Sequence, residues 1–140
     1  MLKESNVISA VCDFLESKQF SIVSRCTELQ RGYDIVARHP LNGKEVRIEA
    51  KGETSSKPET KRFGLPFTNN QVYDHVSKAF YCAAIYAAAE VYSGVAFPKN
   101  AAHIKQVSAI EPILKQLKIE VFWVATDRKV EVLRHWHTWE

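Results

Sequence analysis

Three residues whose types can do chemistry together stand close in the sequence: Asp34, Glu49 and Lys51. Glu49 and Lys51 lie two apart in the strand-like segment 48–51, so their side chains project from the same face. Asp34 lies in the preceding apolar run, residues 32–37. If the two runs pair, two acids and a lysine gather on one half-buried sheet face, where unpaired charges are costly. A divalent metal ion and a phosphate to be cut would account for such a cluster.

The loop between the two runs decides whether the three side chains meet. Asn42-Gly43 is a strong signal for a two-residue hairpin turn. That turn places Asp34 opposite Lys51 and diagonal to Glu49. A four-residue loop ending at Gly43 places Asp34 opposite Glu49 and also keeps all three residues on one face. A loop of odd length sends Asp34 to the other face, because a one-residue slip flips every side chain.

Length and composition describe an ordinary domain. The chain has 140 residues, of which 46% are hydrophobic and 25% charged, so we expect one domain over residues 1–140. The net charge of +3 is small, so any nucleic-acid contact must come from a local patch. Cys12, Cys26 and Cys82 form no Cys-x-x-Cys motif and indicate reduced thiols. The first residues lack an apolar leader, and the apolar stretch 79–91 is too short to span a bilayer. We therefore expect a cytoplasmic protein with no membrane partner.

Hydrophobic periodicity predicts an α/β fold with the element order αβββαβαββ. Helices are expected over residues 4–18, 69–92 and 103–117, and strands over residues 20–28, 32–38, 45–51, 94–97, 121–125 and 130–133. The strand–helix–strand connections in the second half imply parallel pairing, with helices covering a mixed sheet. Residues 52–68 lack periodicity, which is typical of a functional or disordered loop.

This order, with Asp34 on the second strand and Glu49-x-Lys51 on the third, resembles the PD-(D/E)XK nuclease superfamily. The likeness is greatest to the archaeal-type Holliday-junction resolvase-like branch, whose first helix also contributes a Glu near its start. Glu4 occupies that place here. The resemblance implies a restriction-endonuclease-like mixed β-sheet flanked by helices. One position departs from the pattern, because Tyr33 stands where a Pro often precedes the acid.

The resemblance implies a metal-dependent endonuclease that hydrolyses DNA phosphodiester bonds with Mg²⁺, for which Mn²⁺ can substitute. It assigns Asp34 and Glu49 as metal ligands, and Glu4 as a ligand that acts directly or through water. Lys51 would orient or activate the attacking water and counter the charge developing on the phosphate. Gln71, at the start of the long helix, matches a Gln found after the Lys in some branches.

The residue types suit this chemistry. Phosphodiester cleavage needs a nucleophilic water and charge relief on the phosphoryl oxygens, which one or two divalent ions can provide. Mg²⁺ prefers oxygen ligands, keeps several waters and commonly uses one or two carboxylates. Because Asp34 and Glu49 favour the charged form of a neighbouring amine, we interpret the role of Lys51 as mainly electrostatic.

Each of these residues also has a simpler interpretation. Asp34, Glu49 and Lys51 could form a surface ion pair that contributes about 0–1 kcal/mol. Glu4 could be a first-turn acid stabilised by the helix dipole, and Gln71 could face water. Two further functions therefore stay open: a catalytically inactive nucleic-acid-binding domain or subunit of a restriction or repair system, and an interaction domain.

The candidate DNA contacts are basic residues. Lys57, Lys61 and Arg62 lie in the long loop, and Arg25 and Arg31 could extend the patch. Phosphate contacts supply most non-specific affinity for nucleic acid, although a charged loop without that role is an equal alternative. Cutting both strands of a duplex or junction would be easiest for a homodimer.

The last residues contain His135-x-His137 next to Trp136 and Trp139. On a strand both imidazoles would share a face and could contribute to a zinc site. No third ligand stands at useful spacing, so we favour an exposed aromatic tail with Trp136 and Trp139. Cys82 is expected to be a small buried hydrophobe.

Overall fold

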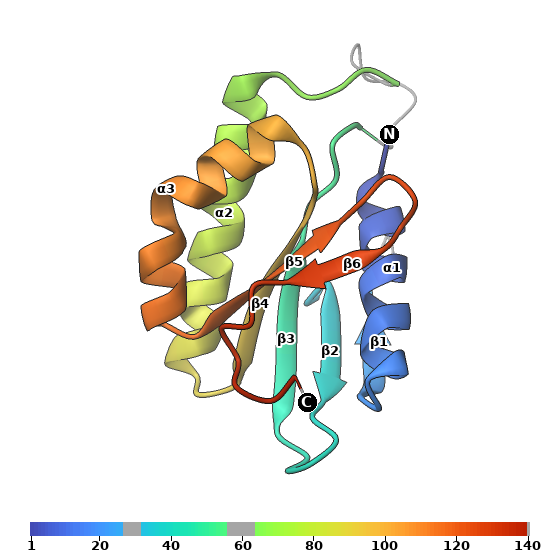
Figure 1. Ribbon diagram of the computed structural model, residues 1–140, viewed down its shortest axis with the longest axis vertical. Helices are drawn as coiled ribbons and strands as arrows, with labels where there is room; N and C mark the ends of the chain where they lie inside the picture. Colours follow the sequence, from blue (N-terminus) through green and yellow to red (C-terminus); the bar gives the residue numbers. More distant parts are fainter. Residues whose placement is uncertain (27–31, 56–63, 140) are drawn as a thin grey trace.

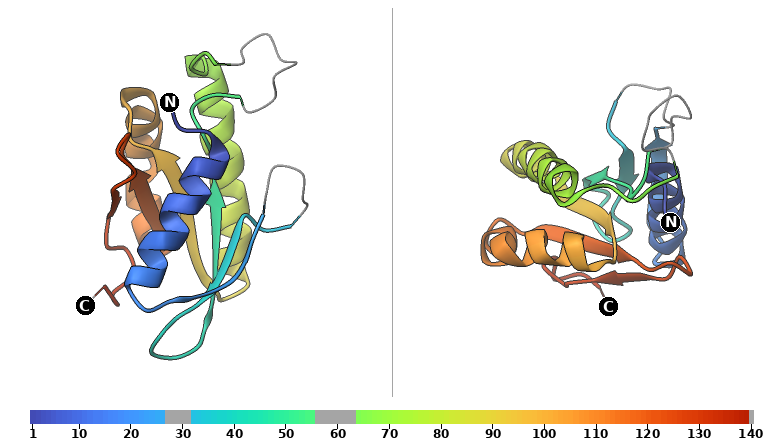
Figure 2. Two further views of the ribbon diagram at one scale, coloured as in Figure 1. Left: turned by 90° about the vertical axis from the view of Figure 1, so that its right-hand side faces the viewer. Right: turned by 90° about the horizontal axis from the view of Figure 1, so that it is seen from above.

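A mixed sheet lies between helix α1 on one face and helices α2 and α3 on the other (Figures 1 and 2). The computed structural model describes residues 1–26, 32–55 and 64–139, and these form three helices and six strands. In chain order they are α1 (Glu4–Ser17), β1 (Ser21–Arg25), β2 (Ile35–Arg38), β3 (Glu45–Ala50), α2 (Asn69–Ala88), β4 (Tyr92–Pro98), α3 (Ala101–Gln116), β5 (Ile119–Val124) and β6 (Val130–Val132). The α/β class and the helix-flanked mixed sheet are confirmed.

The strands lie in the sheet in the same order as in the chain. The pairs β3–β4 and β4–β5 are parallel, and the other neighbouring pairs are antiparallel. The expected parallel pairing in the second half is therefore confirmed. None of the described helices has both the length and the apolar character needed to span a bilayer.

Two apolar clusters hold the helices on the sheet. On one face, Val7, Val11 and Leu15 of α1 belong to the same cluster as Val46, Ile48 and Ala50 of β3. On the other face, Val72, Val76 and Ala79 of α2 belong to a cluster with Val95 of β4. Because side chains alternate along a strand, the remaining β3 side chains, Glu45, Arg47 and Glu49, project to the α2 side. The candidate site therefore lies on the face that α2 and α3 cover.

Some element bounds differ from the sequence-based expectation. The second helix ends at Ala88 instead of Tyr92, because Glu90 adopts a positive φ of 62° that turns the chain into β4. The third helix begins at Ala101 instead of His103, because the Asn100 side chain accepts a 2.9 Å hydrogen bond from the His103 amide. Pro112 lies inside α3 without ending it.

The hairpin between β2 and β3 has the four-residue loop, which was one of the two even-length alternatives, and not the two-residue turn. The paired residues are Arg38 with Glu45 and Ile35 with Ile48. The His39 amide still donates to the Lys44 carbonyl at 2.9 Å, so the loop occupies residues 40–43. The physical reason is that the His39 ring is buried, where it stacks on Tyr92 and packs against Phe20. The loop length is even, so the face on which Asp34 lies is preserved.

The C-terminal segment is packed, and the expectation of an exposed aromatic tail is wrong. Trp136 is 3% exposed, and its ring contacts Phe122 edge to face. The fully buried carboxylate of Glu120 accepts backbone hydrogen bonds from Arg134, His135 and Trp136. These bonds hold the segment against the sheet, because a buried carboxylate without donors would be costly.

Candidate metal and phosphate site

Asp34 and Glu49 form the centre of the candidate site. Continuing the β2–β3 register one step beyond the Ile35–Ile48 pair places Asp34 across from Glu49. The two carboxyl groups lie close enough for each to affect the pKa of the other. Both side chains are half-buried on the α2 side of the sheet. The structure therefore brings together the two acids that the sequence singles out.

Backbone hydrogen bonds on both sides fix Asp34. Its Oδ2 accepts a 2.9 Å hydrogen bond from the Ala50 amide, and its own carbonyl accepts one of 2.9 Å from the Cys26 amide. The first bond ties the carboxylate to β3, and the second ties the backbone to the end of β1. Asp34 is thus held by its two neighbouring strands.

Glu49 contacts a different partner with each oxygen. Oε2 lies 3.7 Å from Nζ of Lys51, whose side chain is 19% exposed. Oε1 accepts a 3.0 Å hydrogen bond from the Tyr86 hydroxyl on α2. Burial raises the pKa of Tyr86, and the charge of Glu49 raises it further, so this hydroxyl stays protonated and donates.

Burial raises the cost of ionising both acids. Burial raises the pKa of Asp34, opposed by the Ala50 amide and the Lys51 charge. Burial also raises the pKa of Glu49, and the neighbouring Asp34 adds to that rise. Two carboxylates that share a site disfavour simultaneous ionisation, and a bound cation would remove that penalty. The pair therefore has the charge and the oxygen atoms that suit a hard divalent cation.

Glu4 lies at the edge of this cluster. A Cβ added to Gly52, the residue after Lys51, would lie 2.5 Å from the Glu4 amide nitrogen. The N-terminus of α1 therefore packs directly on the backbone beyond Lys51. The charge of Glu4 acts on the pKa of the Cys26 thiol together with Asp34 and Glu49. Within residues 1–26, 32–55 and 64–139, however, no three His, Cys, Asp or Glu side chains form a group that could hold a metal ion.

Gln71 takes part in capping α2. The backbone amide of Gln71 donates a 3.2 Å hydrogen bond to the Thr68 hydroxyl. The side-chain oxygen of Gln71 accepts a 2.7 Å hydrogen bond from the backbone amide of Thr68. This reciprocal pair is a capping box, which satisfies backbone donors at a helix start. The structure thus assigns Gln71 a helix-capping contact, and its role at the site stays a prediction.

The basic residues expected to contact DNA are mostly outside the described part. Lys57, Lys61, Arg62 and Arg31 lie in the undescribed segments. Arg25, at the end of β1, lies 3.9 Å from Glu16 in an exposed ion pair. A DNA track through these residues therefore stays a prediction.

Sequence reasoning did not identify Tyr86, Tyr33, Arg47 or Cys82 as neighbours of the acids. Tyr86 continues the buried stripe of α2, so its position in the sequence indicates only a core residue. Cys82 lies one helical turn before Tyr86 and is only partly buried, which corrects the expectation of a buried thiol. Its pKa is raised by burial and then by Glu49, so the thiol lies near the carboxylates.

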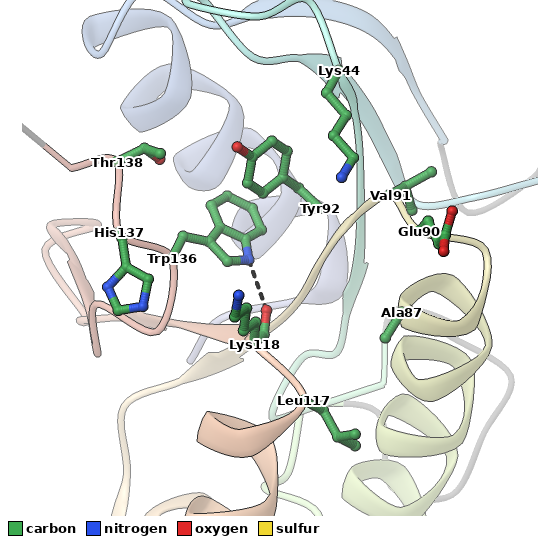
Figure 3. Close-up of a pocket in the computed structure, with 10 residues that line it drawn as sticks. All are labelled: Lys44, Ala87, Glu90, Val91, Tyr92, Leu117, Lys118, Trp136, His137 and Thr138. Carbon is green, nitrogen blue, oxygen red and sulfur yellow. Dashed lines mark hydrogen bonds between the residues drawn. The ribbon is translucent and has the colours of Figure 1, made fainter.

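A cavity of about 540 Å³ lies at the other end of β3 (Figure 3). Its lining includes Lys44, Tyr92, Lys118, Trp136 and His137, and none of the three candidate site residues. The Trp136 indole donates a 3.0 Å hydrogen bond to the Lys118 carbonyl at its wall. This cavity begins where β3 starts, whereas the carboxylates lie towards the end of that strand.

Comparisons with protein-family models, with characterised proteins and with solved structures found no match to this chain. The functional interpretation is therefore based on the geometry of the described residues.

Proposed function

We propose that this protein is a metal-dependent endonuclease that hydrolyses DNA phosphodiester bonds at a site made by Asp34, Glu49 and Lys51. The observation that supports this most strongly is the juxtaposition of three groups: two half-buried carboxylates that face each other, and one ammonium 3.7 Å from the second carboxylate. A surface ion pair would need neither the second acid nor the backbone hydrogen bond that orients it. The helix-flanked sheet is compatible with the restriction-endonuclease-like fold that we propose for the chain.

Asp34 and Glu49 would hold Mg²⁺ or Mn²⁺. The donor set fits a hard cation, because it offers oxygen atoms whose negative charges are incompletely compensated by protein groups. Such an ion supplies positive charge to the phosphate and makes a nearby water a better nucleophile. Glu4, the first residue of α1, would contact that ion through water.

Lys51 would act as a fixed positive charge beside the phosphate. Its side chain is mostly buried, and its Nζ lies 3.7 Å from the Glu49 carboxylate, which holds it beside the two acids. A cation held in a partly desolvated site stabilises developing negative charge more strongly than one in water does. We therefore assign to Lys51 an electrostatic role and not that of a free base.

One observation favours a second candidate, a nucleic-acid-binding domain or a subunit of a restriction or repair system without its own cleavage activity. Among the described residues, no group of three metal-binding side chains is assembled. This alternative predicts salt-sensitive DNA binding without metal-dependent cutting.

A cleavage assay separates the two functions. The substrates are supercoiled, linear, single-stranded and four-way-junction DNA, each with Mg²⁺, Mn²⁺ or EDTA. We expect metal-dependent cutting by the wild type and none by Asp34→Asn, which keeps the side-chain shape and removes the charge. Asp13→Asn, on the exposed surface of α1, is the matched control and should cut like the wild type. Equal cutting by Asp34→Asn and Asp13→Asn would contradict the proposal, and binding without cutting would favour the alternative.

A further inference from the structure

Tyr86 connects α2 to the candidate metal ligand on β3. Its side chain is 5% exposed, and its hydroxyl donates a 3.0 Å hydrogen bond to Oε1 of Glu49. We propose that Tyr86 is a positioning residue of the nuclease site, which fixes the orientation of the Glu49 carboxylate towards Asp34 and the cation that the pair would bind. This inference rests on the proposed function and names a further residue on which that function depends.

The two oxygens of Glu49 are distinguished by their partners. Tyr86 holds Oε1, while Oε2 faces Nζ of Lys51 at 3.7 Å. A glutamate side chain has three rotatable bonds, and tying one oxygen to a buried donor removes most of that freedom. Hydrogen-bond donors behind a metal-ligating carboxylate orient it in this way and tune its affinity. The bond to Tyr86 therefore sets which oxygen is available beside Lys51.

Tyr86 is itself held in place by its neighbours. Its ring meets the ring of Tyr33 edge to face, with centroids 5.3 Å apart and an interplanar angle of 83°. The Arg47 guanidinium lies 4.5 Å from the Tyr33 centroid and 6.0 Å from the Tyr86 centroid. Glu45 pairs with this guanidinium in turn. Such aromatic and cation–π contacts stabilise one ring position, so the hydroxyl reaches Glu49 from a fixed direction.

The position of Tyr33 gives this arrangement a further consequence. Tyr33 directly precedes Asp34 in the chain, and its ring packs on Tyr86. Tyr86 in turn donates a hydrogen bond to Glu49. The two packed rings therefore belong to a residue bonded to one acid through the chain and a residue hydrogen-bonded to the other. The packing of Tyr33 on Tyr86 therefore links the position of Asp34 to that of Glu49. A change that loosens Tyr86 is expected to disturb the geometry between Asp34 and Glu49.

The test is Tyr86→Phe, which keeps the ring packing and removes only the hydroxyl. We expect its kcat for DNA cleavage to fall about 10- to 100-fold, with little change in KM, because the lost bond orients a ligand and does not contact DNA. Calorimetric titration with Mn²⁺ alone should show an affinity lowered by a similar factor. Tyr81→Phe, on the exposed side of the same helix, is the matched control and should match the wild type in both measurements.

A second variant separates positioning from folding. Arg47→Met keeps the Tyr86 hydroxyl and removes the guanidinium that lies against the Tyr33 and Tyr86 rings. Its kcat and Mn²⁺ affinity should therefore also fall, but by a smaller factor than in Tyr86→Phe. Thermal unfolding shows whether each variant is folded. Wild-type cleavage and Mn²⁺ affinity in Tyr86→Phe would overturn this inference and leave the proposed function intact. Absence of both cleavage and Mn²⁺ binding in the wild type would overturn the proposed function, and this inference with it.

Discussion

The backbone amide of Ala50 donates a 2.9 Å hydrogen bond to the carboxylate of Asp34. Ala50 stands between Glu49 and Lys51, so this single bond ties the first acid to the short segment that carries the other two candidate residues. The side chain of Ala50 points to the opposite face, into the apolar cluster beneath α1. The geometry of the charged face is thus fixed by packing on the apolar face of the same strand.

The raised pKa of Asp34 gives a prediction about stability and pH. Burial is the largest cause of the rise, and Glu49 shows a rise in the same direction. The folded protein therefore binds protons more tightly than the unfolded chain, so the free energy of unfolding falls as the pH rises through the unfolded-state and then the folded-state pKa. We expect Asp34→Asn to melt at a higher temperature than the wild type at neutral pH in EDTA.

The same comparison across pH provides the control. The difference in melting temperature should shrink towards about pH 3, where the carboxyl is protonated in both states. Asp13→Asn, exposed on α1, should show no comparable gain at neutral pH. A lower melting temperature for Asp34→Asn at neutral pH would mean that the Ala50 amide and the Lys51 charge outweigh the burial of the carboxylate.

Metal binding should reverse the order of the two melting temperatures, so that the wild type melts above Asp34→Asn. An ion that binds only the folded protein stabilises it by about 2.7 kcal/mol at a concentration 100 times its Kd. For a chain of this size we expect the wild-type melting temperature to rise by about 5–10 °C with saturating Mn²⁺. Asp34→Asn should show little of this rise in a thermal-shift titration. An equal shift in both proteins would place the ion elsewhere.

Gly52 should be intolerant of any side chain. A Cβ at this position would lie 2.5 Å from the Glu4 amide nitrogen and 2.8 Å from the Lys3 carbonyl carbon. Both are backbone atoms, so Gly52→Ala must displace the start of α1 at a cost of about 1–3 kcal/mol. Urea unfolding measures this loss. Ser5→Ala, exposed in the first turn of α1, should stay within about 0.5 kcal/mol of the wild type. Unchanged stability in Gly52→Ala would show that α1 does not need this close approach.

The hairpin shows what the sequence determines at the site and what it leaves open. Alternation of apolar and polar residues identifies both strands and the shared face of Glu49 and Lys51. The loop length depends on the burial of His39 against Phe20 and Tyr92, and Tyr92 lies about 50 positions further along the chain. Local turn signals contain no information about such a distant contact. Asp34 is placed correctly because both even-length loops put it on the same face.

Two other features depend on contacts that no local pattern shows. Tyr86 occupies an apolar position of α2, and only the packing of α2 on the sheet reveals that its hydroxyl meets Glu49. The C-terminal segment has no periodicity, and its burial depends on Glu120, a charged residue within the otherwise apolar strand β5. The sequence predicts an exposed tail because no third metal ligand stands near His135 and His137, and nothing in that spacing indicates that Glu120 points inward.

The central claim is that Lys51 assists metal-dependent cleavage of a phosphodiester bond beside Asp34 and Glu49. The measurement that tests it most directly is the single-turnover rate of nicking of supercoiled DNA in Mn²⁺ by the wild type and Lys51→Ala. Lys44→Ala, at the opposite end of β3, serves as the matched control. We predict that Lys51→Ala slows nicking by about 10²–10³-fold, the usual loss when one electrostatic stabiliser is removed, while Lys44→Ala matches the wild type. Equal rates in Lys51→Ala and the wild type would contradict the account.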